Sequence, residues 1–449
     1  MAVRENISEE LQKYGYVFSW KKNIVLYVIA FLSTILLGRL FRLQGITQIL
    51  LCIGTLLMFP FFLMNTYRSR YNQKRFSDLN IYMEQYLYSF QKTGKVLETL
   101  EDVSKLFADG EMKTCIEEAL SVINHTFDEV DVERKALGLI YQAYPYSGLM
   151  SMHSFSLDVE KNGGEYGNAI LLLLESRRMW ADRNYELLKE KKHERTRVIL
   201  SIITTLLLCS MIYLLSMTLK LDVADNPIAQ AVTLIVLLSD LWIFYLADRK
   251  FSQDDAICDQ KQKTEDVLKA AQRMKKYKRE TIFGKMAYRA ARKRVMRQVE
   301  KDFPKWLMQI SLLLQSDNVQ VAIQKSYDDA PEILKEPILE MVYEMQVNPA
   351  GMEPYLHFLE EYGLPEVSSS MKMLYSISEG TGGDVTAQIG DIIRRNQALT
   401  DRADRLKNED AMAGMYALFL APQITGGFKL AVDMVLLFIV YMARLGNLS

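Results

Sequence analysis

The feature that most constrains this chain is a set of apolar runs of the length that crosses a lipid bilayer. About 30 Å of hydrocarbon requires roughly 20 mostly apolar residues in a helix. Residues 23–38 and 45–64 form one closely spaced pair of such runs, and residues 198–219 and 228–247 form another. The sequence therefore predicts two transmembrane hairpins, at 23–66 and 198–247.

Basic residues flank both hairpins, and the positive-inside rule places such flanks in the cytosol. Lys189, Lys191, Lys192, Arg195 and Arg197 precede the second hairpin, whose loop at 220–227 holds one Lys and two Asp. Arg39 and Arg42 in the loop of the first hairpin oppose this trend. We expect a multi-pass protein of the cytoplasmic membrane, with the N-terminal segment 1–22 and both large polar stretches in the cytosol. Because segment 1–22 is long and polar, we interpret the first run as a retained anchor rather than a signal peptide.

The C-terminal segment 411–449 is apolar up to residue 443 and would measure about 50 Å as one straight helix. Five residues interrupt its pattern: Pro422, Gly426, Gly427, Lys429 and Asp433. One broken crossing or a tight hairpin fits this length, and we favour the single crossing. Lys429 and Asp433 are spaced i,i+4 and can pair on one helix face. Charges inside a membrane are candidates for function, although a structural role in the helix bundle is equally consistent with this pair.

The two polar stretches, 67–197 and 248–410, have the 3–4 spacing of amphipathic helices. One apolar face consists of Leu79, Tyr82, Met83, Tyr86, Leu87 and Phe90, and another of Trp306, Leu307, Ile310, Leu313 and Leu314. Asp302 is a candidate N-cap and Pro304 suits a first turn, so we expect a helix to begin there. The predicted fold class is all-α, with a helical domain at 67–197, basic connecting helices at 248–302 and a second helical domain at 303–410.

The two polar stretches end in a similar signature, which indicates an internal duplication. The first reads Glu160, Lys161, Asn162, Gly163, Gly164, Glu165, and the second reads Glu379, Gly380, Thr381, Gly382, Gly383, Asp384. An Ile stands six residues after the second Gly of the aligned pair in each copy, and an Arg pair follows, at Arg177 and Arg178 and at Arg394 and Arg395. The Gly pair suits a turn between helices, and the acidic residue after it can stabilise the next helix N-terminus.

This order of parts resembles the type II secretion F-domain family, the inner-membrane platform proteins of type II secretion, type IV pili and Tad (Flp) pili. The resemblance is best over 303–406 and weaker over 76–195. Asn318 stands where the family has a small Gly, and Gly94 falls at a different offset in the first copy. The additional N-terminal hairpin is more similar to the Tad branch.

The resemblance implies a scaffold that couples a cytosolic hexameric secretion ATPase to the assembly of pilin or pseudopilin subunits. It also implies contact with membrane lipids and either a homo-oligomer or a hetero-oligomer with a paralogue. The candidate partner interface consists of turn and helix positions of the two signatures: Glu160, Gly163, Gly164, Glu165, Glu379, Gly382, Gly383, Asp384, Arg394 and Arg395.

Catalytic motifs are missing from the sequence, so we expect no enzyme, no cofactor and no metal. The nearest match to a phosphate loop, at 93–96, lacks the upstream Gly and ends in Val96. The 4 His and 4 Cys are scattered, which argues against a metal site. A divalent cation beside the carboxylates of a Gly turn is conceivable, but capping is the favoured interpretation.

The segment 273–301 is strongly basic and amphipathic. It suits anionic lipid headgroups or an acidic partner, and a solvated connecting helix explains it equally well. A net charge of -1 and the nearby membrane spans argue against nucleic acid. The alternative function is a transporter or channel subunit, but the predicted spans hold few charges beyond Asp240, Lys429 and Asp433.

Overall fold

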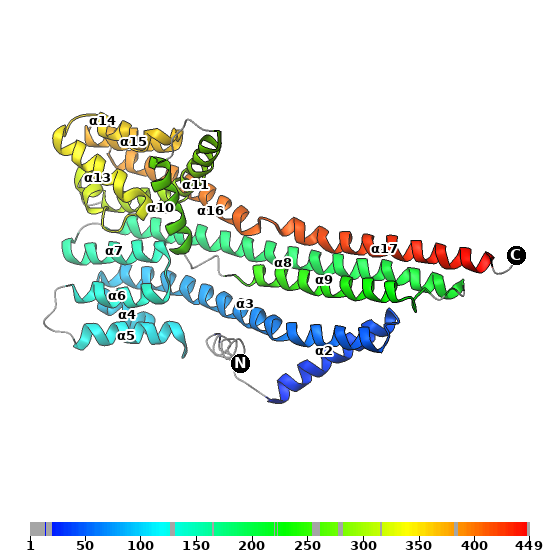
Figure 1. Cartoon of the computed structure of the whole chain (residues 1–449). Coiled ribbons are helices and arrows are strands. Elements are labelled where there is room, and N and C mark those ends of the chain that lie inside the picture. The colour runs from blue at the N-terminus through cyan, green and yellow to red at the C-terminus, as the bar shows by residue number, and fades with distance from the viewer. Residues whose placement is uncertain are drawn as a thin grey trace. The chain divides into compact units, whose positions relative to one another are not determined.

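The computed structural model of the chain describes residues 14, 20–125, 131–163, 166–219, 221, 223–253, 261–276, 282–314, 317–380 and 385–446. The protein is 87% helical, and the described residues contain no strand, which confirms the all-α prediction. Figure 1 labels the helices. They form two compact units: an apolar unit of Met1–Lys74, Glu186–Asp254 and Met412–Ser449, and a polar unit of Arg75–Tyr185 and Asp255–Ala411.

The apolar unit contains the helices that are suited to a membrane. They are α2 (Trp20–Leu40), the first part of α3 (Gly45–Thr93), the second part of α8 (Gly167–Thr218), α9 (Pro227–Phe251) and α17 (Met415–Gly446). Four of them, α3, α8, α9 and α17, are long and apolar enough to cross a membrane, and Ile24–Leu40 is a shorter apolar helix.

The C-terminal apolar segment is one helix, α17, with Pro422 inside it. Gly414, which precedes it, has φ +81°, a backbone conformation that favours glycine and separates α17 from α16 (Val385–Met412). Helix α17 packs along α9. A Cβ on Gly426 would lie 2.0 Å from Cγ2 of Thr205 on α8, so the missing side chain permits the close approach of these two helices.

The side-chain amide of Gln230 connects the loops of the two hairpins. The Nε2 group of Gln230 donates to the carbonyl oxygens of Arg42 (2.9 Å) and Ala224 (2.6 Å). Its Oε1 atom accepts from the backbone N–H of Gln44 (3.0 Å) and from the Thr47 hydroxyl (2.8 Å). All the hydrogen-bonding capacity of this amide is therefore used, and both loops lie at the same end of the apolar unit.

The polar unit begins with a first series of helices in chain order. After the second part of α3 come α4 (Val96–Ser104), α5 (Glu111–His125), α6 (Val132–Ala143), α7 (Ser147–Asn162) and the first part of α8. The predicted apolar face of α3 is buried throughout, from Leu79 to Phe90. Trp180 of α8 stacks on Tyr146, with ring centroids 4.4 Å apart, and contacts Phe76 edge-on.

A second series follows. It consists of α10 (Lys261–Lys276), α11 (Ile282–Leu313), α12 (Val319–Lys325), α13 (Glu332–Val347), α14 (Glu353–His357), the 3₁₀ helix η1 (Glu360–Tyr362), α15 (Pro365–Ser378) and α16. The predicted apolar face from Trp306 to Leu314 is buried. The indole N–H of Trp306 donates to the Ser326 hydroxyl (2.8 Å), and its ring stacks on Phe358.

The expected helix start at Asp302 is wrong. Helix α11 runs through this position, and the buried Asp302 carboxylate accepts a hydrogen bond from Gln298 (2.7 Å) and pairs with Lys305 (3.1 Å). Val295, Val299 and Phe303 form one continuous buried stripe. Packing of this stripe outweighs the backbone hydrogen bond that Pro304 removes inside a helix.

Candidate functional site

Glu160, the first residue of the predicted partner interface, has a role inside its own helix series. It lies near the end of α7, and its Oε2 atom accepts a hydrogen bond from the backbone N–H of Val96 (3.1 Å), the first residue of α4. Carboxylates are stabilising at helix N-termini. Burial raises the pKa of Glu160, while the hydrogen bond from Val96 acts in the opposite direction.

The described glycines with positive φ stand at different positions in the two signatures. Gly163 directly follows α7 with φ +69° and ψ -160°, a region that only glycine occupies without strain. In the second signature the described glycine with positive φ is Gly380 (+63°), two residues after the end of α15. The sequence alignment had matched Gly163 with Gly382. Five predicted residues lie outside the described residues: Gly164, Glu165, Gly382, Gly383 and Asp384.

The remaining predicted residues belong to the second signature. Glu379 directly follows α15 and is exposed, and its backbone N–H donates to Tyr375 O (3.1 Å). Arg394 is exposed and pairs with Asp391 on the same helix, whereas Arg395 is half-buried. Within the described part of the chain, no contact joins these residues to Glu160 or Gly163, so the two signatures do not form one site there.

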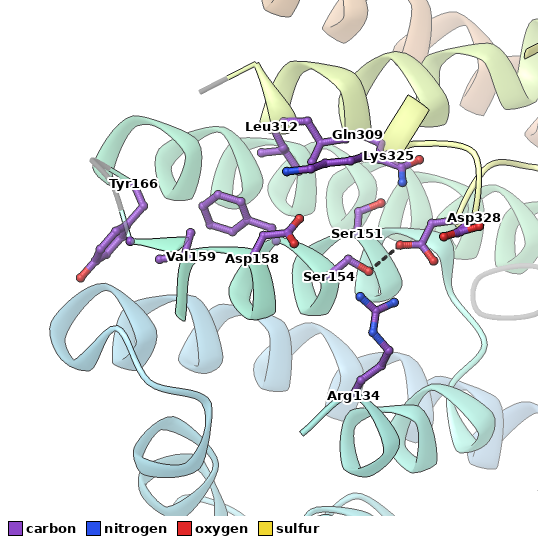
Figure 2. A pocket seen from close by; sticks show the side chains of 14 residues that line it. Arg134, Ser151, Ser154, Asp158, Val159, Tyr166, Gln309, Leu312, Lys325 and Asp328 are labelled. Carbon is purple, nitrogen blue, oxygen red and sulfur yellow. Dashed lines mark hydrogen bonds between the residues drawn. The ribbon is translucent and has the colours of Figure 1, made fainter. Parts of the chain in front are cut away.

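A cavity of about 250 Å³ lies where the two helix series of the polar unit meet (Figure 2). Helix α7 forms one wall, and α11 with α12 forms the other. Across it, the Ser154 hydroxyl donates to the Asp329 carboxylate (2.8 Å). Gly163 and Tyr166 line one part of the cavity, so the first predicted turn borders this junction.

The cavity combines carboxylates with basic side chains from both series. In Figure 2, Arg134 extends towards Ser154, and Lys325 lies on the opposite side. Lys325 pairs with Asp317 (2.8 Å). Burial raises the pKa of Asp158, the positive charges of Lys325 and Arg134 oppose that rise, and Asp317 and Asp329 add to it. These charge contacts suit a junction whose two halves recognise each other.

Sequence reasoning missed this cavity. Its lining residues come from two segments that lie far apart in the sequence, one in each helix series, and none belongs to a motif with characteristic spacing. The only signal was the Gly163 turn, which the sequence identified as part of an interface. No sequence pattern places Ser154 opposite Asp329.

The second predicted site, Lys429 and Asp433, is a buried network in the apolar unit. The Lys429 ammonium donates to the Asp433 carboxylate and to the Tyr213 hydroxyl (3.1 Å). Tyr213 in turn hydrogen-bonds Thr233 of α9 (3.0 Å), and the ammonium lies 5.8 Å from the centroid of the Phe41 ring. Lys429 is 1% exposed and Asp433 0%, so this pair faces other helices and not the surroundings of the unit.

A second polar contact links the same helices. Thr425 of α17 donates to Oδ1 of Asp240 on α9 (3.1 Å). Thr425, Lys429 and Asp433 are spaced four residues apart and lie on one stripe of α17. One oxygen of Asp240 and one of Asp433 are buried without a hydrogen-bond partner. Buried carboxylates of this kind occur at intramembrane functional sites and at helix-packing contacts.

Among the described residues, no group of three or more His, Cys, Asp or Glu is arranged to hold a metal ion. Cys52 and Cys209 are buried free thiols, Cys115 is a partly buried free thiol, and Cys258 lies outside the described residues. No known protein family, curated protein or solved structure matches this chain. The functional assignment therefore rests on the sequence pattern and on the arrangement of helices.

Proposed function

We propose that this protein is an inner-membrane platform subunit of a pilus or type II secretion-like assembly machine. In this role it couples a cytosolic hexameric ATPase to the assembly of pilin or pseudopilin subunits and performs no catalysis itself. The ATPase contacts the polar unit in the cytosol, and the assembling subunits contact the apolar unit in the membrane. Four helices of membrane-spanning length and composition support the membrane location.

The observation that carries the proposal is the matching order of helices in the two series. Each series has a long helix (α3, α11), a short helix (α4, α12), a helix of similar length (α5 with 15 residues, α13 with 16) and a later helix (α7, α15) that ends at a glycine turn. A long helix then follows in both (α8, α16). Between α5 and α7 the first series has α6, and between α13 and α15 the second has α14 and η1.

The short helices also match in their burial pattern, which supports a duplicated unit. In α4 the buried positions are Val96, Thr99, Leu100 and Val103. The corresponding positions around α12 are Val319, Ala322, Ile323 and Ser326, and all four are buried. Positions i, i+3, i+4 and i+7 face the core in both, so the two short helices present the same face.

Each series also leads into the apolar unit. Helix α8 continues from the first series into an apolar span, and α16 is followed by α17. A repeated helical unit next to each apolar segment is the arrangement that the F-domain resemblance implies. This arrangement favours a scaffold over a substrate pathway, since transporters have their repeats within the membrane.

The test is a pull-down of the solubilised protein from its native membrane, followed by mass spectrometry. We expect to recover a hexameric secretion ATPase together with pilin-like subunits. Recovery of the intact protein without either would contradict the proposal. A control bait, another multi-pass protein from the same membrane solubilised identically, identifies non-specific partners.

One observation favours a second function, a transporter or channel subunit. Asp240, Lys429 and Asp433 are all buried among apolar helices, where charges are costly and often functional. Liposomes that contain the purified protein would show flux of an ion or small solute if this function were correct, and Asp240→Asn would abolish that flux. The platform proposal predicts no flux through the wild-type protein or through the Asp240→Asn variant.

A further inference from the structure

The outer surface of α13 is an amphipathic face with three exposed apolar side chains. Leu339, Tyr343 and Val347 are spaced four residues apart and are 55%, 68% and 71% exposed. Beside them on the helix are Glu340, which is exposed, and Glu344, whose side chain is 40% exposed and contacts the His357 imidazole of α14 (3.1 Å). We name these five residues the acidic face. Such a continuous apolar stripe with a charged margin is typical of a binding surface.

The first half of α11 has a surface of the opposite charge. Lys285, Met286, Arg289, Lys293 and Arg294 are all exposed, and Met286 is 64% exposed. We name these five residues the basic face. None of its four basic side chains has an ion pair or hydrogen bond with another part of the described structure. Charges that are left unpaired along one helix face are available to an external partner.

The two faces correspond in spacing as well as in charge. Lys285, Arg289 and Lys293 occur every four residues, and each step of four residues is about 6 Å along a helix. Glu340 and Glu344 have the same step. On the basic face, the apolar Met286 lies next to the charged residues. On the acidic face, the apolar residues Leu339, Tyr343 and Val347 lie next to the two glutamates. When two such helices lie side by side, apolar contacts and ion pairs can therefore form together.

We propose that the acidic face of one copy of this chain binds the basic face of a second copy. The contact joins two different surfaces, so a pair of copies retains one free basic face and one free acidic face, and association continues until a ring closes or a filament forms. This inference does not depend on the proposed function, because the purified chain alone is sufficient to test it.

The test uses charge reversal in the full-length protein, purified in detergent and analysed by mass photometry over a range of concentrations. Wild-type protein is expected to form multiples of the single-chain mass. Glu340→Lys with Glu344→Lys reverses the acidic face, and Arg289→Glu with Lys293→Glu reverses the basic face. Each double variant should weaken association at least tenfold, because like charges then meet across the contact.

The combined variant with all four substitutions is the decisive measurement. Both faces are then reversed, opposite charges meet again, and association should return to within about threefold of wild type. Raising the salt to 1 M should weaken wild type and combined variant alike, since the Debye length falls to about 3 Å. The matched control, Glu117→Lys with Glu118→Lys on the exposed surface of α5, should associate as wild type does.

Three outcomes would overturn the proposal. Wild-type protein could remain a single chain at every concentration. Either double variant could associate as strongly as wild type. The combined variant could stay a single chain although its circular dichroism and melting temperature match those of wild type. If vesicles of anionic lipid bind wild type but neither the basic-face variant nor the combined variant, and association is absent, the basic face binds headgroups instead.

Discussion

At the scale of single residues, His153 shows how burial changes chemistry. It lies in the core of the first helix series, where its Nε2 atom is 3.0 Å from the Tyr82 hydroxyl. Burial lowers the pKa of His153 to about 3, so the folded protein keeps this imidazole neutral. The unfolded chain takes up a proton below about pH 6.5. The neutral His153 side chain therefore makes its full contribution to the stability of the fold above about pH 6.5, and this contribution is lost as the pH falls towards 3.

At pH 5 we expect His153 to lower the free energy of unfolding of the wild-type protein by about 2 kcal/mol. This pH is about 1.5 units below the pKa of histidine in the unfolded chain, and each unit corresponds to about 1.4 kcal/mol. His153→Gln keeps a polar partner for Tyr82 and removes the titration, so its melting temperature should fall less between pH 7.5 and pH 5. His125→Gln, at an exposed position, is the control. Equal acid sensitivity of His153→Gln and wild type would show that His153 is not neutral in the fold.

The pair of Lys429 and Asp433 makes a second prediction at this scale. Removal of one partner from a buried ion pair leaves the other charge uncompensated. Lys429→Met should therefore destabilise the protein by roughly 3 kcal/mol, measured by thermal unfolding in detergent. Lys429→Met with Asp433→Leu should be closer to wild type in stability. If the double variant is as unstable as the single one, the cost lies in lost packing rather than in the unpaired charge.

The sequence predicted that Lys429 and Asp433 could meet, because i,i+4 spacing is a local rule of helices. Their other partners, Tyr213, Thr233 and Phe41, come from distant segments, and no local rule places them. For the same reason the hydrogen bond between Glu160 and Val96 could not be predicted. Spacing predicts neighbours within one helix, whereas contacts between helices depend on how the helices pack.

At the scale of secondary-structure elements, the sequence located the helices better than their ends. The buried faces of α3 and α11 follow from 3–4 spacing, and the structure confirms both. The start predicted at Asp302 failed because N-cap and proline signals are weak next to a long buried stripe. The predicted boundaries at 66/67 and 197/198 fall inside α3 and α8 for a related reason, since a helix can be apolar at one end and amphipathic at the other.

The glycine turn after α7 gives a prediction at this scale. Gly163→Ala should destabilise the protein by about 2 kcal/mol because alanine is strained at φ +69° and ψ -160°, although there is open space for its Cβ. Gly138→Ala, inside helix α6 with equal space, is the matched comparison. It should stabilise by up to about 1 kcal/mol. Chemical denaturation of both variants measures the difference, and equal effects would refute the conformational explanation.

At the scale of the whole molecule, the sequence predicted apolar hairpins from run length and their orientation from charge. Four of the apolar runs appear in helices long and apolar enough to cross a membrane, whereas the first run, at 23–38, lies in the shorter apolar helix Ile24–Leu40. The orientation remains a prediction. The loops of both hairpins lie at one end of the apolar unit, and Arg444 near the end of α17 donates to Leu219 O (3.4 Å) beside the second loop. With the N-terminus in the cytosol, these loops and the C-terminus should all be outside.

Labelling of single cysteines tests this orientation in intact spheroplasts. In a variant without the native cysteines, a membrane-impermeant maleimide should label Asp225→Cys, in the loop before α9, and a cysteine added after Ser449. Glu117→Cys on α5 should react only after the membrane is opened. Labelling of Glu117→Cys in sealed spheroplasts would place the polar unit outside the cytosol and contradict the platform proposal.

The amide of Gln230 also constrains the order in which the protein is made. Its partners Arg42, Gln44 and Thr47 belong to a hairpin that leaves the ribosome long before residue 230 is synthesised. The first hairpin must therefore be inserted and wait with the polar groups of its loop hydrated, and these groups exchange water for the Gln230 amide only when the second hairpin arrives. In the proposed membrane arrangement, insertion and helix association are separate stages, and this junction forms only in the later one.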